Sequence, residues 1–242
     1  AMSAYRPFVL VHGAWHGAWC WQRLAPLLAA AGHRVHAPDL PGHGDDPTPL
    51  AGVTLQAYVE RVAEVLDACA EPALLVGHSM AGVVIAGAAE ARPERVARLV
   101  YLTASLPRDG ESLFDLEALN PSTALRDAML MSADGGSASV HPDRLEALFY
   151  HDCPPADLAL ARERLVPQAL APLVETVSLS AAGFGRVPRH YVTCSEDRAL
   201  VPAFQQSMLA RYPGMPTSDL PTGHSPFFAA PAALAAVLDA LA

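Results

Sequence analysis

Short, uninterrupted apolar runs alternate with segments of helical periodicity along the first hundred residues. The run FVLV (8–11) and the run at residues 73–76 contain no polar position, so each indicates a strand buried on both faces of a parallel sheet. Between them, residues 54–69 place Tyr58, Val62 and Leu66 on one face, which predicts an amphipathic helix with Thr54 as its N-cap.

The order of the expected elements defines the fold class. Strands are expected at residues 8–11, 34–37, 73–76 and 96–103, and helices at residues 19–31, 54–69 and 80–91. Alternating strands and helices predict an α/β fold with a mostly parallel, doubly wound sheet covered on both faces. Strands resume at residues 190–194 and 218–220, followed by a final Ala-rich helix, so the sheet would have about six strands.

The alternation of strands and helices stops between residues 107 and 186. This stretch has short helical patterns but no convincing sheet strand, and residues 132–139 form a Gly/Ser/Ala-rich piece that we expect to be flexible. The chain is therefore predicted to have a core of residues 1–106 and 187–242. A helical lid, residues 107–186, would be inserted after the fourth strand.

Composition excludes several classes of partner. The 242 residues carry a formal net charge of -9 and no basic stripe, so nucleic acid is not an expected partner. All 16 basic residues are Arg, which removes Lys-dependent chemistry and fits a GC-rich bacterial source. Neither a signal peptide nor a membrane span is apparent, so we expect a cytoplasmic protein without a membrane partner. Whether the chain forms a homodimer stays open.

The four cysteines are far apart and follow no metal spacing, and we expect no structural disulfide. Cys69 and Cys194 lie in apolar patterns and are expected to be small core residues. No cofactor or metal is expected, although His16, His43 and Asp39 lie in loops near the start of the chain, because their spacing matches no metal site.

Three side chains that could form a nucleophilic site follow the ends of expected strands. Ser79 lies in LVGHSMAGVV (75–84), and Asp197 and His224 follow later strands. A serine nucleophile needs a base, and the base needs a carboxylate to hold its tautomer. The chain order Ser, Asp, His is that of α/β-hydrolases, although the G-x-S-x-G pattern has Ala81 in its last position.

The chain resembles the α/β-hydrolases, and within them the branch of plant methyl esterases and hydroxynitrile lyases. The stretches that carry the resemblance are FVLVHGAWHGAW (8–19), GHRVHAPDL (32–40), GHSM (77–80), SED (195–197) and GH (223–224). The resemblance implies an α/β-hydrolase fold with Ser79 as nucleophile, His224 as base and Asp197 as its carboxylate. It also implies an oxyanion hole made by the backbone N–H groups of Ala14 and Met80.

The oxyanion assignment has a physical reason besides the resemblance. Met80 would open a helix, where a backbone N–H has no intrahelical partner and the helix dipole favours negative charge. Ala14 lies in the loop after the first strand, from which the second donor of such sites comes.

Other residues compete for a role in the site. Glu196 and Asp109 are alternative carboxylates, since Glu196 adjoins Asp197 and Asp109 follows the fourth strand. The histidines beside the site are expected to be structural hydrogen-bonding or wall residues more often than catalysts. The candidate pocket residues are His12, Gly13, Trp15, His78, Met129, Phe149 and Phe227.

The expected function is a serine hydrolase that cleaves a small to medium apolar carboxylic ester through an acyl-enzyme on Ser79. Lactone or C–C bond hydrolysis on the same triad, and slow turnover by a ligand-binding receptor, remain alternatives. Hydroxynitrile lyases carry a Lys directly after the catalytic His and a Thr at the position of Gly13. This chain has Ser225 and Gly13 at those positions, which disfavours that activity.

Overall fold

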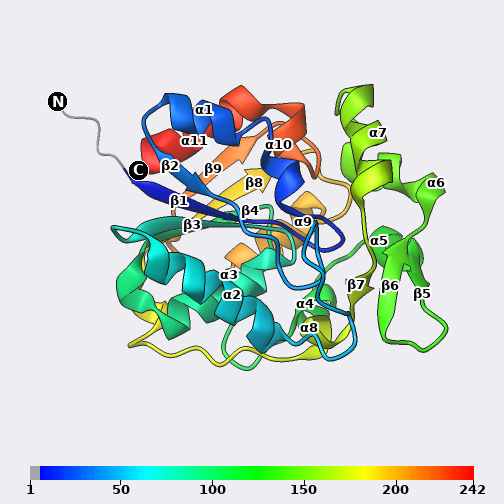
Figure 1. The fold of residues 1–242 in the computed structure, drawn as a ribbon, viewed down its shortest axis with the longest axis horizontal. Coiled ribbons are helices and arrows are strands. Elements are labelled where there is room, and N and C mark those ends of the chain that lie inside the picture. Colours follow the sequence, from blue (N-terminus) through cyan, green and yellow to red (C-terminus); the bar gives the residue numbers. More distant parts are fainter. Residues whose placement is uncertain (1–5) are drawn as a thin grey trace.

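The computed structural model describes residues 6–242, and Figure 1 shows a central sheet between two layers of helices. All six strands of this sheet are parallel and lie in the order β2-β1-β3-β4-β8-β9. Their bounds are β1 (Pro7–Val11), β2 (Arg34–His36), β3 (Ala73–His78), β4 (Val96–Leu102), β8 (Arg189–Cys194) and β9 (Thr217–Leu220). The predicted α/β-hydrolase fold and its six-stranded sheet are therefore confirmed. We expect no signal peptide, but residues 1–5, where one would begin, lie outside the described range.

The strand order reverses at β1, which has β2 on one side and β3 on the other. In open parallel sheets, ligands bind beyond the carboxyl ends of the strands at such a switch point. The loop that follows β1 and the turn that contains Ser79 both start at this edge. All residues of β1 and β3 are buried, as their apolar sequences predict, and Leu10 pairs with Val76 between them.

Helices on the two faces of the sheet fix its strands in place (Figure 1). One layer contains α2 (Leu55–Ala68) and α3 (Ala81–Ala91), and the other contains α1 (Ala25–Ala30) and α11 (Pro231–Leu241). Thr54 caps α2 as predicted, since its hydroxyl accepts a hydrogen bond from the N–H of Ala57. The remaining helices of the core are α9 (Pro202–Leu209), α10 (Pro226–Ala229) and the 3-10 turns η1 (Ala18–Trp21) and η2 (Pro93–Arg95).

The single helix predicted over residues 19–31 is wrong. The structure has η1, then a break, then the six-residue α1. Pro26 lies in the first turn of α1, where its missing N–H does no harm but where a continuing helix would lose a hydrogen bond.

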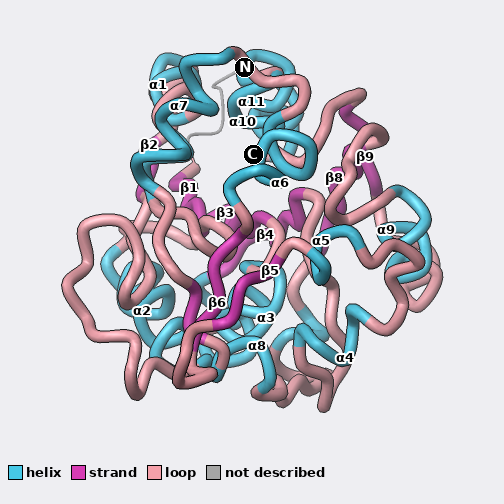
Figure 2. The backbone as a smooth tube through the Cα atoms, turned by 90° about the vertical axis from the view of Figure 1, so that its right-hand side faces the viewer, coloured by secondary structure: helices cyan, strands magenta, loops and turns pink. Residues whose placement is uncertain are grey.

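The stretch between β4 and β8 contains more than helices, so the expectation of a purely helical lid is corrected. Three short antiparallel strands form a second sheet in the order β5-β6-β7, and Figure 2 shows β5 and β6 side by side. We call residues 107–186 the cap. Its elements are α4 (Leu113–Glu117), α5 (Ala124–Asp127), β5 (Met129–Met131), β6 (Ser137–Val140), α6 (Pro142–Leu145), the π-helix η3 (Glu146–Tyr150), α7 (Pro155–Arg164), β7 (Gln168–Ala169), α8 (Ala171–Val174) and the 3-10 turn η4 (Phe184–Arg186).

The piece expected to be flexible, residues 132–139, is instead the turn and second strand of a hairpin. The N–H of Ser132 donates to the carbonyl of Ser137, and Gly135 takes a φ of 71° that suits glycine. Asp134 accepts hydrogen bonds from the Ser132 hydroxyl and the Gly136 N–H inside the turn. Strands of two to four residues are too short to show alternation in the sequence, which is why the pattern missed them.

All four cysteines are free, and Cys69 and Cys194 are buried, as expected of small core residues. Within residues 6–242, no helix has the length and apolarity that a transmembrane span requires.

Candidate active site

Ser79 occupies a sharp turn between β3 and α3. Its φ is 56°, a left-handed conformation that is uncommon for a residue with a side chain. The turn is held from both sides, because the Ser79 carbonyl accepts hydrogen bonds from the N–H groups of Gly82 (3.1 Å) and Ser105 (3.0 Å). Strained residues persist where the surroundings determine them, and they concentrate at functional sites. The half-buried Ser79 lines a cavity at this edge of the sheet.

Two glycines allow the turn to form. A Cβ at Gly77 would lie 2.9 Å from the carbonyl oxygen of Ala81, which is closer than real Cβ contacts. A Cβ at Gly82 would overlap the carbonyl of Ser105, so the backbones of α3 and of the loop after β4 meet there. Ala81 itself is fully buried and accommodated. The tight packing requirement therefore falls on Gly82, one residue beyond the last position of the G-x-S-x-G pattern.

Asp197 and His224 are brought together by the loops after β8 and β9. Nδ1 of His224 lies 2.7 Å from Oδ2 of Asp197, and both side chains are buried. The Thr103 hydroxyl donates to the same Oδ2 at 2.6 Å. Oδ1 accepts the N–H groups of Ala199 (2.8 Å) and Leu200 (3.0 Å). Four donors around one carboxylate fix its orientation toward the imidazole.

The two alternative carboxylates do not contact His224. Asp109 is exposed, and its Oδ1 accepts the N–H of Leu179. Glu196 is also exposed, and its backbone, not its carboxylate, bonds to neighbouring loops, accepting a hydrogen bond from His151. The geometry thus leaves Asp197 as the carboxylate that orients His224.

His78, the residue before Ser79, contacts His224. The ring of His78, which directly precedes Ser79, is 4.6 Å from the ring of His224, and its Nε2 donates to the His224 carbonyl at 2.7 Å. No hydrogen bond that involves Ser79 Oγ is present among residues 6–242. Catalytic hydrogen bonds are often long or misaligned in ligand-free structures and tighten on binding.

Two backbone N–H groups beside Ser79 are available to a ligand. Neither the amide of Ala14 nor that of Met80 donates to an acceptor in the described part of the chain, and both residues line the Ser79 cavity. Met80 immediately precedes α3 and has helical backbone angles, so its amide points out of the first turn of an eleven-residue helix. Free donors at a helix start suit a developing negative charge.

His16 fixes the loop after β1 to the cap. Its Nδ1 faces the carbonyl of Ala14 at 2.8 Å, and its Nε2 faces the hydroxyl of Tyr150 in η3 at 2.6 Å. A carbonyl only accepts, so Nδ1 carries the hydrogen and Nε2 accepts from Tyr150. Burial lowers the pKa of His16 from 6.5 to about 4, which keeps this neutral tautomer. His16 was expected to be a loop residue, and it is one. Its ring is buried, and both ring nitrogens have hydrogen-bond partners.

His12 and His43 form a similar buried layer beneath that loop. Nδ1 of His12 donates to the Gly13 carbonyl, and its Nε2 accepts the N–H of Leu40. Nε2 of His43 lies 3.0 Å from the Tyr58 hydroxyl. Burial lowers the pKa of both imidazoles, and each is held in the neutral form. These histidines shape the loop and do not face the cavity.

His78 is buried behind Ser79 in the same way. Its Nε2 donates to the His224 carbonyl, so its Nδ1 is the acceptor nitrogen, and this atom has no partner within the described residues. Burial, with a contribution from His224, lowers the pKa of His78 well below its usual value. Its neutral ring supports the backbone of His224 without adding charge to the site.

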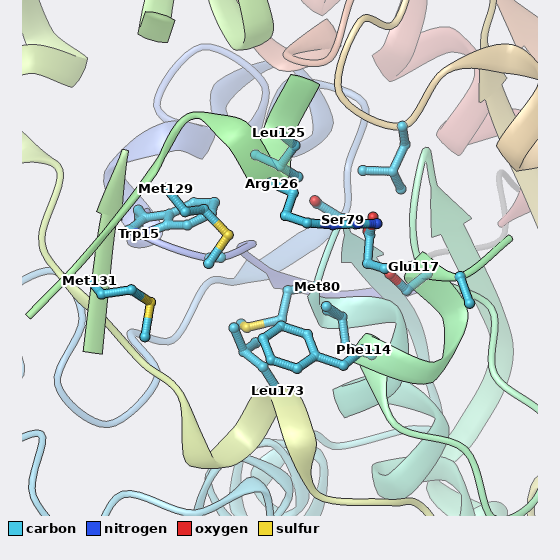
Figure 3. A pocket seen from close by; sticks show the side chains of 15 residues that line it. Trp15, Ser79, Met80, Phe114, Glu117, Leu125, Arg126, Met129, Met131 and Leu173 are labelled. Atoms are coloured by element: carbon cyan, nitrogen blue, oxygen red, sulfur yellow. The ribbon is translucent and has the colours of Figure 1, made fainter. Parts of the chain in front are cut away.

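The Ser79 cavity has a volume of about 550 Å³ and a mostly apolar wall built largely by the cap (Figure 3). Trp15 and Met129 lie on this wall, as the sequence suggested. The other five candidate pocket residues, His12, Gly13, His78, Phe149 and Phe227, are not among the residues that line it. The wall residues outside the candidate set are Ser105, Leu113, Phe114, Glu117, Ala118, Leu125, Arg126, Met131, Leu173 and Leu200.

Two charged side chains interrupt the apolar wall. Glu117 at the end of α4 and Arg126 in α5 lie at the Ser79 end of the cavity in Figure 3. Burial raises the pKa of Glu117, opposed by a hydrogen bond from Asn120 and by the nearby charge of Arg126. No sequence signal marked either residue, because helices of four and five residues have no periodicity that shows which side faces inward.

No group of three or more His, Cys, Asp or Glu side chains suited to a metal ion occurs within residues 6–242. The candidate site therefore consists of a serine, a histidine paired with a carboxylate, and two backbone N–H groups without an acceptor among the described residues. It lies at the switch point of the parallel sheet.

A family model described as the alpha/beta hydrolase family matches residues 8–237, and the chain belongs to that family. Among its relatives, methylesterase 1 of Arabidopsis thaliana is 34% identical over 240 residues, which cover 93% of this chain and 91% of that protein. Putative methylesterase 11, chloroplastic, of the same plant is 33% identical over 239 residues. That match covers 94% of this chain and 61% of the relative, so the chain spans about three fifths of that protein's length.

Solved structures agree with this placement. A pyrethroid hydrolase from Sphingobium faniae JZ-2 superposes with a TM-score of 0.87 at 29% identity, covering 98% of this chain and 97% of that one. Polyneuridine aldehyde esterase superposes with a TM-score of 0.89 at 27% identity, covering 98% and 99%. The resemblance to the branch that contains plant methyl esterases is thereby confirmed.

Proposed function

We propose that this chain is a serine carboxylic-ester hydrolase. The observation that carries the proposal is the Asp197–His224 pair at 2.7 Å, beside a serine held in a strained turn. A buried imidazole whose Nδ1 is fixed by a carboxylate presents Nε2 as a base. The names of the relatives, methylesterases and an esterase, support ester hydrolysis as the reaction.

The proposed reaction has two halves. Ser79 Oγ attacks the ester carbonyl carbon while His224 Nε2 takes the hydroxyl proton, and Asp197 stabilises the imidazolium that forms. The N–H groups of Ala14 and Met80 stabilise the oxyanion. The C–O bond to the alcohol then breaks, and His224 protonates the leaving alkoxide. A water molecule, deprotonated by His224, then attacks the acyl carbonyl carbon; the bond from that carbon to Ser79 Oγ breaks, His224 returns the proton to Oγ, and the carboxylic acid leaves.

The cavity supports a small to medium apolar ester as substrate. Its volume of about 550 Å³ suits a compact organic molecule, and Leu113, Leu125 and Leu173 give much of its wall aliphatic character. A neutral, apolar group beside the ester would bury its surface there and gain binding free energy.

The residue after His224 argues against cyanohydrin cleavage. Ser225 occupies the position of the lyase Lys, and its hydroxyl donates to the Phe149 carbonyl at 2.6 Å. It is fully buried, so no cationic group stands at that place to bind cyanide. Lactone or C–C bond hydrolysis would use the same triad, and the experiment below separates lactone hydrolysis from ester hydrolysis.

A fluorophosphonate probe followed by peptide mapping tests the nucleophile, because two serines, Ser79 and Ser105, line the cavity. We expect the label on Ser79 alone. A label on Ser105, or none, would contradict the proposal. A panel of methyl and aryl esters, lactones and cyanohydrins then tests the reaction. We expect the highest kcat/KM for esters. A preference for lactones would reassign the reaction to lactone hydrolysis.

A further inference from the structure

Trp15 borders two separate cavities. It lines the Ser79 cavity, and it also lines a second cavity of about 300 Å³ whose other walls come from the cap. The second cavity is bordered by Ser139, Val140, Pro142, Leu145, Arg162, Leu165, Val166 and Pro167. Figure 3 shows the indole beside Met129, at the side of the first cavity away from Glu117. Among the residues of the two walls, Trp15 is the one they share.

The position of Trp15 is fixed by two hydrogen bonds. Its indole N–H donates to the Ala138 carbonyl in β6 at 2.8 Å, and its own carbonyl accepts the N–H of Val166 at 3.1 Å. Its φ of 64° is uncommon for a bulky residue, so the surrounding contacts hold it in a conformation that it would not adopt by itself. With 6% of its surface exposed, the indole is a wall and not a mobile flap.

We propose that Trp15 is the partition between the two cavities and sets the longest ester chain that the site accepts. This inference rests on the proposed ester hydrolysis. The occupant would be the distal end of an aliphatic chain, which now stops at the indole. Val140 and Leu145 give the far side of the partition an apolar wall, while the exposed Arg162 and Pro167 border it where it meets solvent. Without the indole, the chain would continue into this space.

The test compares p-nitrophenyl esters from acetate to decanoate in wild type, Trp15→Ala and Trp15→Phe. The readout is the ratio of kcat/KM for decanoate to that for acetate within each variant, which cancels losses common to both esters. Because each newly buried methylene adds binding free energy, the ratio should rise about tenfold or more in Trp15→Ala and change little in Trp15→Phe. An unchanged ratio in a folded Trp15→Ala protein overturns the partition, and Trp15→Leu replaces this variant if it does not fold.

Filling the second cavity separates a partition from a general loosening of the site. Val140→Trp alone should leave the wild-type ratio unchanged, since the closed cavity is not used. In Trp15→Ala/Val140→Trp the ratio should return toward wild type. A lower ratio in Val140→Trp alone would show that the two cavities are already joined, which contradicts the inference.

A binding measurement keeps this test independent of turnover. Isothermal titration of decanoate and butyrate should show that Trp15→Ala gains affinity for decanoate alone. If wild type does not hydrolyse p-nitrophenyl acetate, the proposed function fails, yet this titration still decides whether Trp15 divides the cavity. Equal affinity changes for both acids would overturn the partition by itself.

Discussion

Oδ2 of Asp197 lies 2.7 Å from Nδ1 of His224, and the rest of the carboxylate is occupied by donors from Thr103 and two backbone amides. The imidazole therefore has one orientation and one tautomer open to it. An amide at this position can present its N–H₂ group to Nδ1, which would favour the wrong tautomer.

We expect Asp197→Asn to lower kcat for an activated ester by about four orders of magnitude, with a much smaller change in KM. Asp109→Asn is the matched control, because that carboxylate bonds only to the N–H of Leu179 at the surface, and its kcat should stay near wild type. Steady-state kinetics of the two variants decide the point. A greater loss in Asp109→Asn would reassign the carboxylate.

Gly82 is expected to be the least tolerant position of the serine turn. Since a methyl group there would overlap the Ser105 carbonyl, Gly82→Ala must separate α3 from the loop that anchors Ser79, at a cost of about 1–3 kcal/mol or more. Ala81→Gly is the control and should keep activity. Thermal denaturation and kcat measure both effects. A fully active and stable Gly82→Ala enzyme would show that the backbone contact is not required.

Stability should fall as the pH is lowered from 6.5 toward 4. Burial lowers the folded-state pKa of His16 to about 4, whereas the unfolded chain has a value near 6.5. Above pH 6.5 both states are neutral. Below it the unfolded state takes up a proton that the folded imidazole does not, so this residue alone removes about 2 kcal/mol by pH 5. The lowered pKa values of His12 and His78 act in the same direction.

Denaturant unfolding of wild type and His16→Gln at pH 7.5 and pH 5.0 measures this contribution. The difference in unfolding free energy between the two pH values should shrink in His16→Gln. In the control His141→Gln, whose side chain is 44% exposed, the difference should match wild type. An equal pH dependence in His16→Gln and wild type would show that His16 is not the group responsible.

The sheet and the triad positions were predictable from the sequence because each depends on a local pattern. The runs at β1 and β3 contain only residues that bury on both faces, and Ser79 and Asp197 each follow a buried strand closely, whereas His224 follows the short and mostly exposed β9. Parallel strands bring their carboxyl ends to one edge, so chain order alone places these loops together.

The cap was not predictable in the same way. Its strands and most of its helices have two to five residues. Such segments are too short for strand alternation or helical periodicity to be recognised in the sequence. Which cap residues face the cavity follows from how the β5–β6 hairpin packs on Trp15, a long-range contact that no local signal contains. Glu117 and Arg126 were missed because helices of five and four residues show no periodicity that marks their inner face. A cytoplasmic location, a bacterial source and a homodimer stay predictions.

Pre-steady-state hydrolysis of p-nitrophenyl acetate by wild type and Ser79→Ala tests the central claim most directly. If Ser79 carries an acyl-enzyme, wild type releases p-nitrophenol in a burst equal to the enzyme concentration before a slower steady state, provided that deacylation limits turnover. Ser79→Ala should show no burst and no turnover above its background rate. A Ser79→Ala enzyme that hydrolyses the ester at the wild-type rate would contradict the account.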